Sequence, residues 1–369
     1  MDTAERRAVA ALWCLPGIGP RSVERIRAAL GDLGQQLERP VERWAPSVEL
    51  PPAQAGALRR VPEALAAVAD RLERRLRQVG QRAIYPGQPA WPAGLHGVRE
   101  APPVLFVQGP GAAVAPRRRA AVVGTRHPDP GVCEQVTALA AHLAEAGMGV
   151  VSGAAEGVDQ AAHAGALRAG GETWAFLGEG IDRLTGPRAS LATELRRRGG
   201  TLFSQHPPGT PGSAAAFRRR NPLISGASDV VLVARAPLKS GALITAAAAR
   251  AQGRPLLAVP GDPWNPRAEG CNRLLLDRHA APCLSADEVL AAVGLPLRRH
   301  SGRTPTPGPT SSAAGEVLAS IRQGGVDVDL LAARTGLEVG RLMGLLVELQ
   351  LAGHLVQKGG GRYELSGPS

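Results

Sequence analysis

Lysine and aromatic residues are scarce in this chain of 369 residues. Lysine occurs only at Lys239 and Lys358, and Phe, Trp and Tyr together make up 3% of the chain. Proteins that hold nucleic acid mainly by stacking its bases need more rings than this. If the chain binds nucleic acid, arginine is therefore expected to carry the binding, because its guanidinium group meets phosphate oxygens with two parallel N–H donors.

The sequence also lacks long apolar runs and paired cysteines. No stretch of about 20 apolar residues exists, which argues against a membrane span, and the N-terminus lacks the pattern of a signal peptide. The four cysteines, Cys14, Cys133, Cys271 and Cys283, do not have the spacing of a metal site. We expect reduced thiols in a cytoplasmic protein.

Positive charge is abundant instead. The net charge is +11 and the isoelectric point is near 10.8, which indicates a polyanionic partner. A codon bias toward arginine and alanine is the alternative explanation of the composition. It does not account for the clusters in which the arginines occur.

The first 80 residues predict a small helical domain. Apolar residues at helical spacing place two helices within 4–30, around the turn Leu15–Pro20. This pattern is typical of a helix-hairpin-helix (SAM-like) unit, whose glycine amides approach a DNA phosphate, or of a plain packing unit. Residues 57–79 predict one more helix.

Residues 84–297 predict an α/β domain. Short apolar runs alternate with alanine-rich segments of helical length, which is typical of βαβ units and a parallel sheet. The predicted strands are 104–107, 120–123, 149–152, 173–177, 201–204, 230–234 and 256–259. The Pro/Ser/Thr/Gly-rich segment 298–313 is expected to be a linker. Residues 314–369 predict three helices and a hairpin, the pattern of a winged helix, with Arg341 as the only cation of its third helix.

Three glycine-rich turns follow predicted strands. They contain Gly124-Thr125-Arg126, then Ser152-Gly153 with Gly157, and thirdly residues 175–182. The carboxyl ends of parallel strands share one edge of the sheet, so the turns can converge on a phosphate there. Tight βα turns without a ligand are the alternative. The fingerprint of dinucleotide sites is missing, because Arg126 and Asp129 occupy its second and third glycine positions.

Two basic segments are expected to border these turns. The first is FRRRN, with Arg218, Arg219, Arg220 and Asn221, and the second contains Lys239, Ser240 and Gly241. A catalytic site is harder to assemble. Asp159 and His163 are four residues apart, which suits an acid–base or metal pair, but a helix-capping Asp above a buried His is the more ordinary interpretation. We predict no catalytic residue, metal or cofactor.

At this point the sequence resembles the DNA-processing protein A (DprA/Smf) family of bacterial recombination mediators. The resemblance rests on ordered motifs along nearly the whole chain: IYPGQPAWPAGL, AVVGTR, VVSGAAEGVDQAAHAGAL, LGEGID, FRRRN, SGALITAAAA, AVPGDPWNPRAEGCNRLL and the C-terminal LLAARTGL…LAGHLVQKGGGRYEL.

The resemblance implies an extended Rossmann-like core flanked by an N-terminal helical domain and a C-terminal winged-helix domain. It implies a cytoplasmic, non-enzymatic homodimer that binds single-stranded DNA and loads the recombinase RecA onto it. RecA loading would serve natural transformation and DNA recombination or repair, against bound single-strand binding protein. It also implies that the Gly124–Arg126 turn, the Ser152-Gly153 turn and the basic segment before Asn221 line the DNA pocket.

The sequence departs from the family pattern at four places. Leu184-Thr185-Gly186 follow Gly-Ile-Asp where Tyr-Pro is usual, and Gln205, Pro222 and Ala234 replace an acid, an arginine and an acid. These departures leave the detailed DNA path open. Two other functions also stay open: a regulator that binds duplex DNA through its end domains, and a Rossmann-like nucleotide phosphoribohydrolase, whose catalytic loop is not matched near Gly178.

Overall fold

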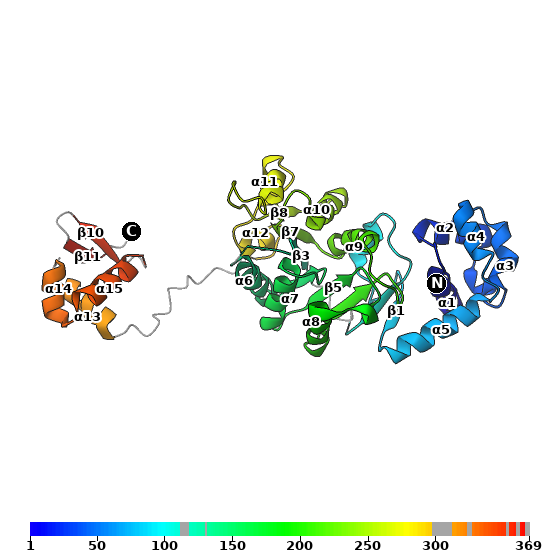
Figure 1. Cartoon of the computed structure of the whole chain (residues 1–369), viewed down its shortest axis with the longest axis horizontal. Coiled ribbons are helices and arrows are strands. Elements are labelled where there is room, and N and C mark those ends of the chain that lie inside the picture. Colours follow the sequence, from blue (N-terminus) through cyan, green and yellow to red (C-terminus); the bar gives the residue numbers. More distant parts are fainter. Residues whose placement is uncertain are drawn as a thin grey trace. The chain divides into compact units, whose positions relative to one another are not determined.

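The computed structural model describes residues 1–110, 118–129, 131–296, 312–322, 327–351, 354–358 and 362–365. They belong to two compact units, Met1–Leu297 and Arg298–Ser369. Each unit is described by itself (Figure 1). The predicted linker lies outside the described residues except for its last two, which open a helix.

The first unit begins with short helices, as the sequence predicts. Asp2 caps the first helix by accepting a hydrogen bond from the Glu5 amide (2.8 Å), and Pro20 opens the second helix, where its missing N–H costs nothing. The prediction of one helix over 57–79 is wrong, because Pro62 interrupts it. The helices are α1 (Thr3–Trp13), α2 (Pro20–Leu30), α3 (Val41–Trp44), α4 (Pro52–Leu58) and α5 (Leu65–Gln78), with the 3-10 turns η1 (Leu33–Gln36) and η2 (Ala45–Ser47).

A nine-stranded sheet forms the centre of this unit, in the order β1-β2-β6-β5-β4-β3-β7-β8-β9. Its strands are β1 (Arg82–Ile84), β2 (Leu105–Gln108), β3 (Arg119–Gly124), β4 (Gly149–Ser152), β5 (Thr173–Leu177), β6 (Thr201–Ser204), β7 (Val230–Arg235), β8 (Leu256–Ala258) and β9 (Ala281–Pro282). The pairs from β6 to β9 are parallel. The strand predicted at 104–107 is not part of the parallel array, because β2 runs antiparallel to both β1 and β6.

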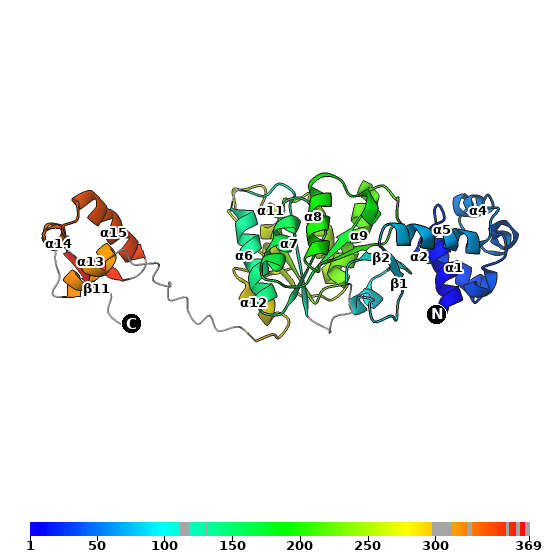
Figure 2. The same cartoon turned by 90° about the horizontal axis from the view of Figure 1, so that it is seen from below.

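Helices cover both faces of the sheet, as parallel strands require. One face carries α6 (Val132–Glu145), α7 (Val158–Arg168), α8 (Gly186–Arg197) and α12 (Ala286–Ala291). The first three stand side by side in Figure 2. The other face carries α9 (Ala214–Gly226), α10 (Gly241–Ala251) and α11 (Glu269–Leu276), with the 3-10 turn η3 (Ala93–Gly97).

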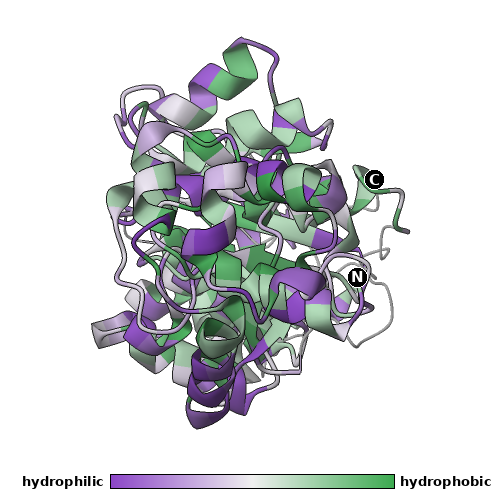
Figure 3. Ribbon diagram, turned by 90° about the vertical axis from the view of Figure 1, so that its right-hand side faces the viewer, coloured by the Kyte–Doolittle hydropathy of each residue, from purple (hydrophilic) through white to green (hydrophobic). Residues whose placement is uncertain are grey.

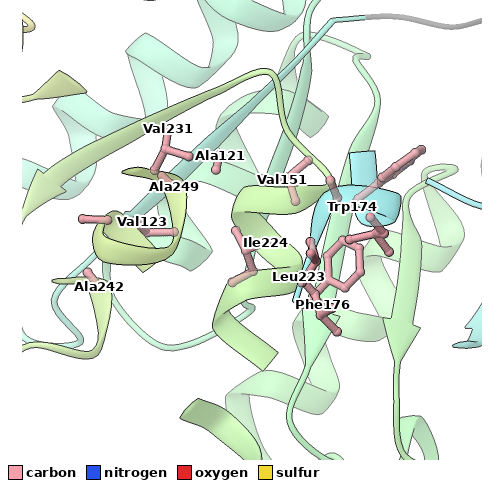
Figure 4. Close-up of a cluster of buried hydrophobic side chains, with 14 of the residues drawn as sticks. Ala121, Val123, Val151, Trp174, Phe176, Leu223, Ile224, Val231, Ala242 and Ala249 are labelled. Carbon is pink, nitrogen blue, oxygen red and sulfur yellow. The ribbon is translucent and has the colours of Figure 1, made fainter. Parts of the chain in front are cut away.

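The two faces of each strand are buried by different helices. Ala121 and Val123 point toward α9 and α10 (Figure 4), whereas Ala120 and Val122 pack against α6 and α7. The helices themselves carry hydrophilic and hydrophobic stretches side by side (Figure 3). This explains why the strands read as unbroken apolar runs in the sequence and the helices do not.

The strand order reverses between β3 and β7. The strands that follow β3 in the chain, β4, β5 and β6, lie on one side of it in the sheet. The next strands, β7 and β8, lie on its other side. Loops after β3 and β7 therefore leave the sheet in opposite directions and open a crevice at its carboxyl edge. Open α/β sheets bind their ligands at such a switch point.

The second unit has the predicted winged-helix elements: α13 (Ser312–Arg322), α14 (Val328–Thr335), α15 (Val339–Leu351) and the hairpin β10 (Leu355–Lys358) with β11 (Arg362–Leu365). Asp327 caps α14 by accepting from the Leu330 amide (2.9 Å). Gly336 ends α14 with a left-handed φ of 65°, as a C-terminal glycine should. Among the described residues of the whole chain, no helix is both long and apolar enough to span a bilayer.

Candidate nucleic-acid interface

A cleft of about 600 Å³ lies at the switch point between β3 and β7. Most of the predicted site residues line it. They come from three segments distant in sequence: Gly124, Thr125 and Arg126 after β3, Arg218, Arg220 and Asn221 on α9, and Lys239, Ser240 and Gly241 before α10. The structure thus brings nine predicted residues together. Ser152, Gly153, Gly157 and Arg219 do not line this cleft.

The cleft carries positive charge that the protein does not neutralise. Arg126, Arg218 and Lys239 are exposed, and within the described part of the chain none of them pairs with a carboxylate. The one acidic residue that lines the cleft is Asp159, which is buried. An anion entering the cleft would therefore meet three cations with free donors.

Two helices point their N-terminal ends at the cleft. The first turns of α9 and α10 contribute Ala214, Gly241 and Ala242 to its lining. The Asn221 amide nitrogen donates to the Gly241 carbonyl (3.0 Å), which ties the two helices together. Because the N-terminus of a helix carries partial positive charge, both helices favour an anion in the same space.

Three backbone amides of the glycine turns are already hydrogen-bonded within the protein. The Thr125 amide donates to the Arg235 carbonyl (2.7 Å). The amides of Gly153 and Ala155 donate to the Asp159 carboxylate (3.1 and 3.3 Å). An Asp side chain thus occupies donors that the sequence analysis assigned to a phosphate. It also does not cap α7 as expected, since that helix begins after Gly157 and the carboxylate binds the preceding loop.

Ser152, Gly153 and Gly157 support the cleft from behind. The buried Ser152 hydroxyl donates to the Val122 carbonyl (2.7 Å). A Cβ atom at Gly153 would lie 2.2 Å from the Arg220 guanidinium, and one at Gly157 would lie 2.6 Å from the Thr125 carbonyl. Both glycines therefore allow other lining residues to come close, which a side chain would prevent.

Arg220 is the buried charge beneath the cleft. Its side chain is 4% exposed and donates to the Phe176 carbonyl at the end of β5. Burial lowers the pKa of Arg220 to about 10, opposed by the charge of Asp159. Burial also raises the pKa of Asp159, opposed first by Arg220 and then by the Ala155 and Gly153 amides. Their opposite charges stabilise each other below the cleft, where α7, α9 and β5 meet.

His163 takes no part in the site. It is fully buried, and its Nδ1 lies 2.7 Å from the Thr173 hydroxyl. Because that hydroxyl donates to the Val150 carbonyl (3.0 Å), it accepts from the imidazole. Burial lowers the pKa of His163 to about 3, so the ring is neutral. No hydrogen bond joins it to Asp159, and the described residues contain no cluster of His, Cys, Asp and Glu suited to a metal ion.

Phe217 is a lining residue that the sequence analysis missed. The guanidinium groups of Arg126 and Arg188 lie 5.7 and 5.2 Å from the centre of its ring. Arg188 is paired with the buried Glu179. In a chain with few aromatic residues, a phenylalanine directly before an arginine run was the signal available. Its ring offers the cleft a surface on which a base can stack.

Comparisons with known proteins identify the family of the chain. The family model of the DNA recombination-mediator protein A matches residues 82–294, more than half of the chain. The chain belongs to this family. A model of the DprA winged helix domain matches residues 301–361.

Individual relatives extend the match to almost the whole chain. A DNA processing protein DprA of Mycobacterium tuberculosis is 36% identical, with 94% of this chain and 88% of the relative covered. The X-ray structure of DprA from Streptococcus pneumoniae is 27% identical, with a TM-score of 0.54 over 74% of this chain and 98% of that one. A DprA structure from Helicobacter pylori shares the fold, with 24% identity, a TM-score of 0.52, and 58% and 95% of the two chains covered.

Proposed function

We propose that this protein binds single-stranded DNA in the cleft between β3, β7, α9 and α10. The observation that carries the proposal is the set of exposed, unpaired cations Arg126, Arg218 and Lys239 around two helix N-termini. Phosphates would lie against these side chains and not against the Thr125, Gly153 and Ala155 amides, which are hydrogen-bonded internally. Of the thirteen predicted site residues, nine line this cleft, whereas Ser152, Gly153, Gly157 and Arg219 do not.

A single strand suits the cleft better than a duplex. Its volume of about 600 Å³ is that of a small-molecule pocket, with room for a few nucleotides. Phe217 offers its ring to an unstacked base, which a duplex does not present. The related H. pylori protein is described by its single-stranded DNA binding mode, which supports the same ligand here.

The wider role that fits this activity is the loading of RecA onto single-stranded DNA during natural transformation and recombination. RecA, single-strand binding protein and a second copy of the chain are the partners that family membership suggests. We propose that the protein acts in the cytoplasm and without catalysis. The absence of catalysis is supported by His163, which is buried and neutral, and by Asp159, whose carboxylate accepts from the Gly153 and Ala155 amides.

Fluorescence anisotropy with one labelled oligonucleotide, single-stranded and then annealed, tests the proposal across a salt series. Arg126→Ala is expected to weaken single-strand binding similarly for different sequences and to reduce the salt slope by about one. Arg197→Ala is the matched control. Arg197 is equally exposed but lies in the last turn of α8, which has crossed back toward the opposite edge of the sheet.

Two results would contradict the proposal. Duplex binding as tight as single-strand binding, with no response to Arg126→Ala, would move DNA binding to another surface. Equal losses in the Arg126 and Arg197 variants would reduce the effect to overall charge. RecA loading is tested separately by the rate of RecA filament growth on DNA covered by single-strand binding protein. The wild-type chain is expected to raise this rate, and the Arg126→Ala variant is expected to leave it low.

A further inference from the structure

A second cleft, of about 510 Å³, lies between the N-terminal helices and the sheet domain. The turn Gly17-Ile18-Gly19, predicted as a helix-hairpin-helix-like turn, forms one wall. The opposite wall comes from the loop after β6 and from α9. The Trp13 indole crosses between the two parts and donates to the Gln205 carbonyl (2.6 Å). The hairpin turn therefore faces the core of its own unit.

Helix α9 separates this second cleft from the first. Arg218 and Asn221 line the first cleft, while their chain neighbours Arg219 and Pro222 line the second. Successive residues of an α-helix point about 100° apart, so one short segment serves both spaces. A polymer that leaves the first cleft across α9 crosses the width of one helix, about 10 Å, to reach the second.

The second cleft is also basic. Arg99 and Arg219 are exposed and, within the described residues, have no carboxylate partner. Among the described residues that line it, the one acid is Glu100, which is paired with Arg21 of α2 (2.6 Å). Burial and then the charge of Arg219 lower the pKa of His206 to about 4, which leaves that ring neutral.

The walls of the second cleft suit a base as well as a phosphate. Ile18, Pro207, Pro222 and Leu223 give it apolar sides. Glu100 holds its ion pair from a left-handed backbone, with φ at 61°, a conformation that non-glycine residues adopt at a cost. The Arg21–Glu100 pair thus fixes the rim of the cleft through a strained turn.

We propose that the second cleft is an extension of the DNA site, in which the strand passes over α9 and places a further nucleotide between the N-terminal turn and the loop after β6. Arg219 and Arg99 hold its phosphate. The inference rests on the proposed function, because it continues the same strand. In this arrangement the N-terminal helices increase the number of nucleotides that the protein covers.

Strand length separates the two clefts experimentally. Oligothymidines of about 4 and about 16 nucleotides span the usual range of single-strand site sizes. Arg219→Ala is expected to weaken binding of the long strand roughly fivefold and to leave the short strand within about twofold. Arg218→Ala, its neighbour on α9, is the matched control and is expected to weaken both strands alike.

Arginine modification of the unaltered protein by phenylglyoxal, read by mass spectrometry, gives a second measurement. The long strand is expected to protect Arg99 and Arg219, and both strands are expected to protect Arg126 and Arg218. Arg99 and Arg219 staying as reactive with the long strand as without DNA would overturn the inference and leave the proposed function intact. Absence of protection at all four arginines would overturn both the inference and the proposed function. Protection of Arg219 without protection of Arg126 or Arg218 would refute a single strand that passes through both clefts.

Discussion

His163 lies at the inner side of α7, where it is fully buried and neutral. Its pKa is about 3 in the folded protein and about 6.5 in an unfolded chain. The unfolded state therefore binds the extra proton first, as the pH falls below about 6.5. The stability that depends on the neutral ring is complete above that pH and is lost progressively toward pH 3.

This gives a prediction for the variant His163→Leu. In the wild type, His163 alone should lower the free energy of unfolding by about 1.4 kcal/mol per pH unit below about pH 6. The variant lacks this group, so its loss of stability between about pH 6 and about pH 4 should be smaller. Urea unfolding of both proteins at a series of pH values measures the difference. If the free energy of unfolding falls equally with pH in both proteins, His163 does not titrate between about pH 6 and about pH 4.

The kinds of residue in the site were easier to predict from the sequence than the cleft that each side chain faces. The basic segments and glycine turns were visible in the sequence, and nine of the predicted residues meet in one cleft. The separation of Arg218 from Arg219 was not predictable, because it depends on where α9 begins and how it is rotated against the sheet. The use of the Gly153 amide by Asp159 was hidden for the same reason, since it depends on the path of a loop.

At the scale of elements, the turn at Gly157 holds two loops together. Its φ of 78° is left-handed, and an added Cβ would lie 2.6 and 2.8 Å from the carbonyl oxygens of Thr125 and Arg126. The loop after β4 thus supports the loop after β3, which carries the lining residues of the cleft.

Gly157→Ala is therefore expected to cost more than backbone strain alone. With φ at 78° and ψ at −121°, Gly157 lies outside the left-handed helical region, which costs an alanine about 1–2 kcal/mol. Its backbone strain is therefore at least that large, and the clash adds to it by pushing the Thr125–Arg126 loop away. Gly170→Ala is the control, because Gly170 has a φ of 66° with no atom within 4 Å of the added Cβ. Thermal unfolding should show the larger loss for Gly157→Ala, and only this variant should bind single-stranded DNA more weakly. Equal losses of thermal stability in the two variants would mean that the contact between the added Cβ and the two carbonyl oxygens is relieved at no cost.

The central strands were predicted well because they are buried on both faces and leave apolar runs. Three of the predicted strands, 149–152, 173–177 and 201–204, have the observed bounds. β1 and β9 were missed, since strands of three and two residues carry no periodic signal. The antiparallel direction of β2 depends on pairing with β1 and β6, which the sequence of β2 does not encode.

At the scale of the whole molecule, both clefts belong to the first unit. The third helix of the winged-helix unit, α15, exposes Val339, Met343 and Val347 and has Arg341 as its one cation. A chain that ends at residue 296 should therefore keep its single-strand affinity within about twofold, as expected for independent sites. Anisotropy on the full and shortened chains measures this. A loss of affinity or of salt slope on shortening would assign part of the DNA binding to the second unit.

The Asp159 carboxylate has a consequence for how quickly the strand can be handed on. A ligand seated on rigid backbone amides must break all of its bonds to a fixed frame at nearly the same time. Here Asp159 accepts from the Gly153 and Ala155 amides, so in the proposed site the strand would meet the separate side chains of Arg126, Arg218 and Lys239. If the strand binds there as proposed, each of these side chains could release its phosphate alone, and another protein growing along the DNA could replace the contacts one after another without waiting for the whole strand to leave.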